Sequence, residues 1–276
     1  NEKSFCTTKS TQVSIELFLK SGDVIVLKDN ISLLEGEIID TSFMSINKLK
    51  KFIKSEIQNC KDLNLLLSLH MKATMMKISD PIIFGYVIEI YFADLFKKYH
   101  NVFSDIGVDV RNGFGDILDK INNFFNNQKS EIFSDIERIL ENNASLAMVD
   151  SDKGITNLHV PSDVIIDASM PAMIRNSGKM WNKEGEAQDT KAIIPDSSYS
   201  SIYSATIDFC KKHGAFDPTT MGTVPNVGLM AQKAEEYGSH DKTFEISESG
   251  TIKVLDESRN VLIEHEVEQG DIWRMC

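Results

Sequence analysis

The chain has 276 residues, of which 42% are hydrophobic and 25% are charged, and its formal net charge is −12. These values are typical of a globular protein with one large domain or two small ones. Because lysine and arginine are scattered along an acidic chain, nucleic acids and anionic membrane surfaces are not expected partners. The longest apolar run, from Pro81 to Phe96, contains Glu89 and Asp94 and is too short to cross a bilayer.

The cysteines and the two ends of the chain indicate its cellular setting. The four cysteines are far apart and show no C-x-x-C spacing, so we expect free thiols in a reduced, cytoplasmic protein. The first residues contain neither an initiating methionine nor a signal sequence, and residues 270–276 end on an apolar segment instead of a polar tail. We therefore expect an internal piece of a longer protein.

The first part of the chain predicts a hairpin, a helix and a buried strand. Apolar residues alternate over 13–19, a Lys-Ser-Gly-Asp turn follows, and a second strand covers 24–27. Ser45 is the predicted N-cap of an amphipathic helix that carries apolar residues at helical spacing as far as Ile57. The nearly all-apolar run from Leu63 to Met76 is typical of a strand buried on both faces.

Helices dominate the middle of the chain. Asp80 and Pro81 predict the start of a long helix, and two further helices with polar faces are expected between residues 116 and 143. Two short apolar strands follow, at 146–149 and 164–166. The first leads into Asp150 and the second into Asp167, so each would place a carboxylate where a strand ends.

The last third combines helices with short strands. Ser197 is the predicted cap of a helix that stops at Gly214, and a second helix is expected from near Pro225 to Tyr237. Alternating segments at 243–246, 251–255 and 261–267 predict three strands. Because strands and helices intermix throughout, the predicted fold class is α/β.

Two segments of the chain echo each other. Residues 38–42 and 165–169 both contain Ile-Ile-Asp, and each is followed by a Lys-Ala pair and by a helix with two adjacent lysines. A duplicated unit, with subdomains 1–145 and 146–276, and a chance similarity account for this echo equally well.

No segment of the sequence matches a loop that cradles phosphate. Gly113-Phe114-Gly115 has only two of the three glycines of the dinucleotide fingerprint and is expected to be a turn. Ser177-Gly178-Lys179 lacks both the first glycine and the final hydroxyl residue of a P-loop.

Asp167 is the first candidate for a functional residue. A carboxylate at the carboxyl end of a strand lies in the crevice where open α/β sheets bind ligands, and Mg²⁺ prefers oxygen ligands. An aspartate at such a place also serves as a helix cap or a turn residue, and the segment by itself does not separate these roles.

Lys72 and Tyr237 are candidates for proton transfer. A lysine in an apolar surround has a lowered pKa and can exchange protons near neutrality, although a lysine at a strand end also simply reaches water. A Schiff-base role for Lys72 would require a cofactor phosphate site, which the sequence lacks. Tyr237 is either a proton donor or a packing residue in the last turn of its helix. His159 and His240 lack metal-ligand spacing and receive no role.

Three segments taken together resemble the monomeric NADP-dependent isocitrate dehydrogenases. They are residues 72–77 with 79–81, residues 150–163, and residues 213–218 with 237–242. The resemblance extends from about Gly36 to Cys276 and is weakest between Ile121 and Asn143. It implies part of the central domain of a longer enzyme, with a mixed sheet and flanking helices like those of isocitrate and isopropylmalate dehydrogenases.

The resemblance also implies an activity and a set of roles. Lys72 and Tyr237 would be catalytic and contact the substrate isocitrate, and Asp167 would be a ligand of Mg²⁺ or Mn²⁺. The parent enzyme, expected to be a monomer, would convert isocitrate to 2-oxoglutarate and CO₂ with NADP⁺. Most NADP contacts and the other substrate and metal ligands lie outside the matched region, so the chain alone is expected to be inactive. The alternative is a non-enzymatic domain of the same fold that binds a metabolite or a partner.

Overall fold

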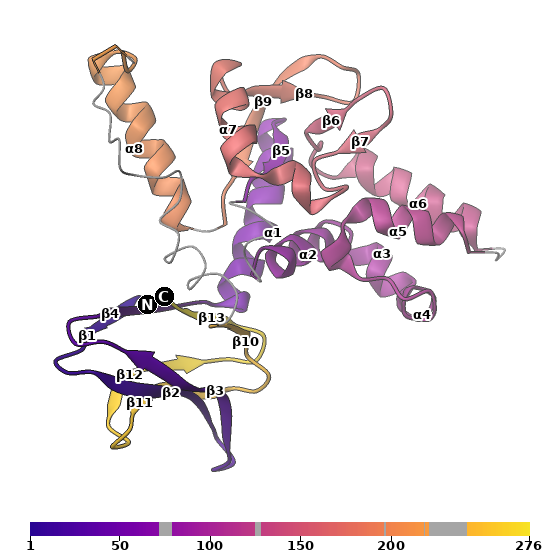
Figure 1. The fold of residues 1–276 in the computed structure, drawn as a ribbon. Coiled ribbons are helices and arrows are strands. Elements are labelled where there is room, and N and C mark those ends of the chain that lie inside the picture. Colours follow the sequence, from indigo (N-terminus) through magenta and orange to yellow (C-terminus); the bar gives the residue numbers. More distant parts are fainter. Residues whose placement is uncertain (72–78, 125–127, 196, 218, 221–241) are drawn as a thin grey trace. The chain divides into compact units, whose positions relative to one another are not determined.

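The computed structural model describes residues 1–71, 79–124, 128–195, 197–217, 219–220 and 242–276 (Figure 1). These residues form two compact units. The described part of the first unit is 1–49, 79 and 242–276, and that of the second is 50–71 and 80–220 with the gaps given above. The first unit thus combines residues from both ends of the chain, and the subdomains 1–145 and 146–276 stay a prediction.

The first unit consists of two four-stranded antiparallel sheets in its described residues. One sheet has the order β1 (Lys3–Cys6), β4 (Ile38–Met44), β13 (Ile272–Met275) and β10 (Thr243–Glu245). The other has the order β12 (Val261–Val267), β11 (Gly250–Asp256), β2 (Thr11–Leu19) and β3 (Val24–Leu33). In each sheet a strand from the start of the chain pairs with a strand from its end, as β2 does with β11 and β4 with β13.

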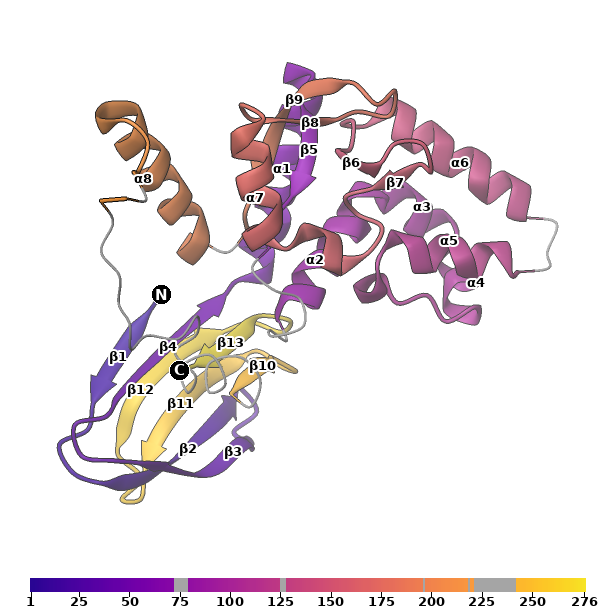
Figure 2. The same ribbon diagram turned by 45° about the horizontal axis from the view of Figure 1, so that its top comes forward.

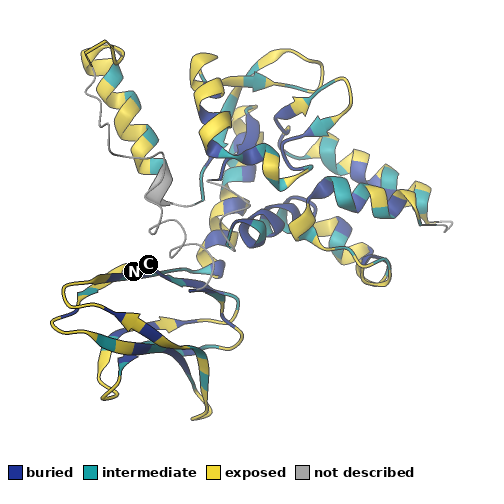
Figure 3. Cartoon of the chain, viewed as in Figure 1, coloured by how far each residue is buried: buried dark blue, intermediate teal, exposed yellow. Residues whose placement is uncertain are grey.

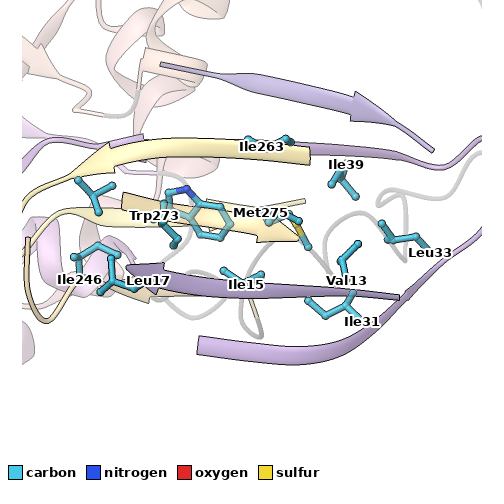
Figure 4. Packing of buried hydrophobic residues seen from close by; sticks show 13 residues of the cluster. Val13, Ile15, Leu17, Ile31, Leu33, Ile39, Ile246, Ile263, Trp273 and Met275 are labelled. Atoms are coloured by element: carbon cyan, nitrogen blue, oxygen red, sulfur yellow. The ribbon is translucent and has the colours of Figure 1, made fainter. Parts of the chain in front are cut away.

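The core of this unit lies between the two sheets (Figure 4). Val13, Ile15 and Leu17 are every second residue of β2, and each is at most 2% exposed. Trp273 of β13 packs among them and is fully buried. This period of two is what a strand with one buried face requires, since successive side chains point to opposite faces.

Most of the strands predicted for this unit are confirmed. The hairpin is β2 and β3, and its turn contains Gly22 at a φ of 98°, a left-handed conformation that glycine adopts without steric cost. The three C-terminal strands appear as β10, β11 and β12. β13 was not predicted, because residues 270–276 were interpreted only as an abrupt end.

The second unit contains a curled mixed sheet of five strands. Their order is β5 (Leu66–Leu69), β9 (Ala187–Ile193), β8 (Lys179–Trp181), β6 (Met148–Asp150) and β7 (Ile155–Thr156). β5 and β9 are parallel, and the other pairs are antiparallel. Leu146, just before β6, forms a bridge back to Leu67 of β5, so the sheet bends toward itself.

The second unit also contains helices, several of which flank this sheet (Figures 1 and 2). They are α1 (Ile46–Leu63), which begins in the first unit, α2 (Ser79–Tyr91), α3 (Ala93–Lys98), α4 (His100–Asp105), α5 (Phe114–Asn122), α6 (Lys129–Asn142), α7 (Ile166–Arg175) and α8 (Ser197–His213), together with the 3₁₀ turns η1 (Val110–Asn112) and η2 (Pro161–Val164). The predicted fold class, α/β with a mixed sheet and flanking helices, is confirmed.

The predicted helices in the described part of the chain are also confirmed. α1 follows Ser45, α2 begins beside Asp80, α5 and α6 lie between residues 114 and 142, and α8 ends before Gly214. α2 is buried along most of its length (Figure 3). The helix expected from Pro225 to Tyr237 lies outside the described residues.

Two strand predictions need correction. The buried strand expected over residues 63–76 begins later than predicted, at Leu66 of β5, because α1 continues to Leu63 and Asn64 then reverses the chain at a φ of 53°. Its expected end, residues 72–76, lies outside the described residues. The strand expected at 164–166 is wrong: η2 ends at Val164, and α7 starts at Ile166.

The structure also bears on the predictions for the cysteines and for membrane-spanning segments. All four cysteines are free thiols, as expected, and Cys60 is buried within α1. Among the described helices none is long and apolar enough to cross a membrane.

Candidate functional site

Of the three residues predicted for the site, the structure describes only Asp167. Asp167 lies in the first turn of α7 and its side chain is exposed. Lys72 and Tyr237 both lie outside the described residues. The candidate site is therefore built from Asp167 and from the described residues that lead toward Lys72.

Asp167 begins a helix instead of ending a strand. Only Ile165 keeps a trace of strand pairing, through one parallel bridge to Met71. Ile166, Met170 and Met173 then recur at helical spacing and pack against Met180 of β8 and Ala192 of β9. The predicted strand was wrong because three apolar residues do not distinguish a strand from the start of a helix.

One edge of β5 binds three separate chain segments in succession. The N–H of Leu67 donates to the carbonyl of Ser145, and the N–H of Ala147 donates to the carbonyl of Leu67. Two residues beyond β5, the N–H of Met71 donates to the carbonyl of Val164 at 2.8 Å. The N–H of Ile166 donates to the carbonyl of Met71 at 2.6 Å. The end of β5 is thus joined by its main chain to the first turn of α7.

Asn157 binds Leu69, which lies between Leu67 and Met71 on this edge. Its side chain accepts from the N–H of Leu69 at 2.6 Å and donates to the carbonyl of Leu69 at 3.1 Å. Its own N–H donates to the carbonyl of Ala147. Asn157 is 1% exposed, so one buried amide takes the place that a neighbouring strand would occupy.

His70 holds the opposite edge of the same segment. Its N–H donates to the carbonyl of Ile193 in β9, and its ring Nδ1 is hydrogen-bonded to the hydroxyl of Ser169 at 2.7 Å. Burial lowers the pKa of His70 to about 4, so the ring is neutral at neutral pH. Ser169 lies two residues after Asp167, which makes His70 a second link between β5 and the first turn of α7.

Sequence reasoning missed both Asn157 and His70. An asparagine in a segment rich in turn residues indicates a turn, and a lone histidine in an apolar run indicates only a buried ring. The signal that identifies them is long-range pairing, since Asn157 is 88 residues from Leu69 and Ser169 is 99 residues from His70. No local pattern contains that information.

Two buried polar atoms next to this junction lack partners in the described part of the chain. They are the hydroxyl of Ser68 and Nε2 of His70. Both residues are fully buried, and Ser68 lies on β5 while His70 directly follows the strand. Buried polar atoms are normally hydrogen-bonded, so this end of β5 is where additional polar groups are expected.

The glycine pair that failed as a nucleotide fingerprint has a packing role. A methyl group on Gly113 would lie 2.1 Å from the carbonyl oxygen of His159, and Gly113 has a φ of 104°. The N–H of Gly115 donates to that same carbonyl at 2.9 Å. Nδ1 of His159 in turn accepts from the N–H of Thr156. These contacts join the start of α5 to the loop after Asn157, and they explain both glycines without a ligand.

The donors that the structure describes fit a divalent metal only in part. Asp167 is an exposed residue, and a carboxylate is a type of ligand that suits Mg²⁺ or Mn²⁺. Asp150 instead caps its own turn, where hydrogen bonds from Lys153 lower the pKa of its carboxyl group. In the described ranges no three His, Cys, Asp or Glu side chains converge on one point.

The fold and this junction define an α/β protein with a carboxylate placed beside the carboxyl end of a buried parallel strand, which is where such sheets bind ligands. Comparison with known proteins gives the family. A model described as monomeric isocitrate dehydrogenase matches residues 1–276, and the chain belongs to that family.

Several relatives are similar over the whole chain. It is 55% identical over 276 residues to the isocitrate dehydrogenase (NADP) of Azotobacter vinelandii and covers 37% of that protein. It is 54% identical to isocitrate dehydrogenase (NADP) 2 of Colwellia maris and 52% identical to isocitrate dehydrogenase (NADP) 2 of Mycobacterium tuberculosis, with 100% of this chain and 37% of each relative covered. The chain thus spans little more than a third of the length of these relatives.

Proposed function

We propose that this chain supplies a metal ligand and proton-transfer residues to an enzyme that converts isocitrate to 2-oxoglutarate and CO₂ with NADP⁺ and Mg²⁺ or Mn²⁺. Family membership and the names of the relatives support the activity. The observation that carries the site is the pair of hydrogen bonds between Met71 and the residues on either side of Ile165. Lys72 follows Met71 in the sequence and Asp167 follows Ile166, so this pairing supports one shared site for both.

The proposed roles follow from the chemistry of each side chain. Oxidation at C2 of isocitrate requires removal of its hydroxyl proton, and Lys72 accepts that proton. Asp167 holds the divalent cation, which when bound polarises the substrate oxygens and stabilises the negative charge released on decarboxylation. Tyr237 donates a proton to C3 of the decarboxylated product. Lys72 and Tyr237 both contact the substrate.

We also propose that the chain by itself is inactive. One carboxylate does not complete the coordination of Mg²⁺, and the sequence offers no dinucleotide loop. The remaining ligands and most of the NADP contacts would come from the rest of a longer, monomeric, cytoplasmic enzyme, of which this chain is part of the central domain.

The test is turnover by the full-length protein. Wild type should reduce NADP⁺ when isocitrate and Mg²⁺ are present. Lys72→Met and Tyr237→Phe should each lower kcat by roughly 10²-fold or more, because general acid–base catalysis contributes about that much. Lys153→Met and Tyr91→Phe are matched controls, since Lys153 is an exposed turn residue and the Tyr91 hydroxyl binds the carbonyl of Ala144.

Two results would contradict the proposal. Near-normal turnover by Lys72→Met and Tyr237→Phe would remove the assigned roles. Binding of isocitrate by wild type with no turnover would favour the non-enzymatic alternative.

A further inference from the structure

We infer that Asn157 and His70 are positioning residues that hold the first turn of α7, and with it the carboxylate of Asp167, at a fixed place beside the end of β5. The inference rests on the proposed function for its catalytic consequence. Neither residue would touch the substrate. Each acts through the main chain or through Ser169.

The first argument is the pattern along one edge of β5. Leu67, Leu69 and Met71 all direct their main-chain groups to this edge, since alternate residues of a strand pair with the same side. Leu67 pairs with residues 145 and 147, and Met71 pairs with residues 164 and 166. Leu69 lies between them and pairs with the side chain of Asn157. The amide therefore makes two separate pairings continuous, which sets the register of Met71 against α7.

The second argument is burial. Leu69, Asn157 and Met71 are 2%, 1% and 4% exposed, so water does not replace a lost hydrogen bond. Without the amide both main-chain groups of Leu69 would be buried without a partner, a costly state that the segment would relieve by shifting. Such a shift would be transmitted directly to Met71 and Ile166.

The third argument is the side-chain hydrogen bond of His70. The His70 ring is fully buried and joined to Ser169, and its main chain is joined to Ile193. The start of α7 is thus connected to β5 through the main chain of Met71 and through the His70 side chain. These links act at Ile166 and at Ser169, so they restrict the first turn of α7 at both of its ends.

The inference is tested in the full-length enzyme with Asn157→Ala and Ser169→Ala, and with Ser169→Thr as the conservative variant that keeps the hydroxyl. Tyr91→Phe is the matched control, because it removes a buried hydrogen bond of 2.6 Å in the same unit but outside this junction. For each protein kcat, the Mn²⁺ concentration for half-maximal activity and the melting temperature are measured.

Asn157→Ala and Ser169→Ala should raise the half-saturating Mn²⁺ concentration roughly tenfold or more, and should lower kcat, under conditions in which both are folded. Ser169→Thr should recover most of the loss. Tyr91→Phe should lower the melting temperature and leave the Mn²⁺ requirement unchanged.

The inference is overturned if the alanine variants lose only melting temperature, as the Tyr91→Phe control does, or if Ser169→Thr is as impaired as Ser169→Ala. If Asn157→Ala does not fold, the two Ser169 variants decide. A wild-type enzyme without isocitrate-dependent NADP⁺ reduction would instead reject the proposed function itself, so the two failures are distinguishable.

Discussion

At Gly113 an added methyl group would clash with the main chain of His159. The Cβ of Gly113→Ala would lie 2.1 Å from the carbonyl oxygen of His159, at a φ of 104° that side chains rarely adopt. We expect a loss of about 2–4 kcal/mol in the free energy of unfolding, from backbone strain and a contact that only backbone movement relieves. Denaturant unfolding of wild type and Gly113→Ala measures this difference in free energy.

Gly154→Ala is the control for this prediction. Gly154 also has a positive φ, of 69°, but nothing lies within 4 Å of an added Cβ. The variant should lose only about 1–2 kcal/mol, the cost of a left-handed conformation alone. Equal losses at the two positions would contradict the packing role of Gly113.

His265 makes the stability of the first unit depend on pH. Its ring is hydrogen-bonded to the hydroxyl of Thr41 at 2.8 Å. Burial first, and the positive charge of Lys3 second, lower its pKa from 6.5 to about 4. The unfolded chain therefore binds this proton more readily than the folded chain. The contribution to stability is full above pH 6.5 and is lost as the pH falls from 6.5 toward 4.

His265→Gln should flatten this pH dependence, because glutamine does not titrate. Melting temperatures between pH 4 and pH 7 would show a smaller decline on acidification than in wild type. His100→Gln, at an exposed position, serves as the control and should keep the wild-type slope. An unchanged slope in His265→Gln would refute the prediction.

At the scale of elements, Asp135 of α6 connects three groups. Its carboxylate accepts from Lys98 at 2.7 Å, from the hydroxyl of Tyr99 at 2.8 Å and from Arg138 at 2.8 Å. It is 7% exposed, and the hydrogen bonds from Lys98 and Tyr99 lower its pKa. α6 is thus fastened to the junction of α3 and α4.

Asp135→Asn should destabilise the chain by about 1–3 kcal/mol, the usual effect of weakening buried hydrogen bonds to a charged group. The difference from wild type should be present above the ordinary aspartate pKa of 3.8 and should disappear as the pH falls below it. Glu131→Gln is the control, since the exposed Glu131 carboxylate shares Lys98 but should contribute little. Similar losses in both variants would argue against the fastening role.

Elements with a long, regular pattern could be predicted from the sequence. α1, α2 and α8 have apolar residues at helical spacing, and in β2 apolar residues recur at every second position from Val13 to Leu19. The start of α7 could not be predicted, because the three-residue apolar run 164–166 is too short to distinguish the period of a helix from that of a strand. The start of β5 was predicted too early, because the apolar residues at the end of α1 run into those of the strand.

The candidate site could be predicted only in part, because some of its contacts join segments that are far apart in the sequence. Asp167 was identified as a carboxylate next to a short apolar segment, although it begins a helix and does not end a strand. Asn157 and His70 were missed, because their roles depend on partners about 90 residues away. Lys72 and Tyr237 stay predictions that rest on the family resemblance.

At the scale of the whole molecule, the two units differ in how the sequence encodes them. The second is formed by one nearly continuous stretch, whereas the first joins β2 to β11 and β4 to β13 across more than 200 residues. Such pairings depend on which surfaces are complementary and are not visible in any local window. The sequence therefore predicted β2, β3 and β10–β12 of the first unit, but neither β1, β4 and β13 nor the way the strands combine.

The central claim is that Asp167 is a metal ligand in an NADP-dependent isocitrate dehydrogenase. The most direct test is the Mn²⁺ dependence of isocitrate-driven NADP⁺ reduction by the full-length protein and its Asp167→Asn variant. Asp152→Asn, at an exposed turn of the same unit, is the control. The account predicts that Asp167→Asn raises the half-saturating Mn²⁺ concentration roughly tenfold or more, while Asp152→Asn matches wild type. An Asp167→Asn enzyme with the wild-type Mn²⁺ requirement would contradict it.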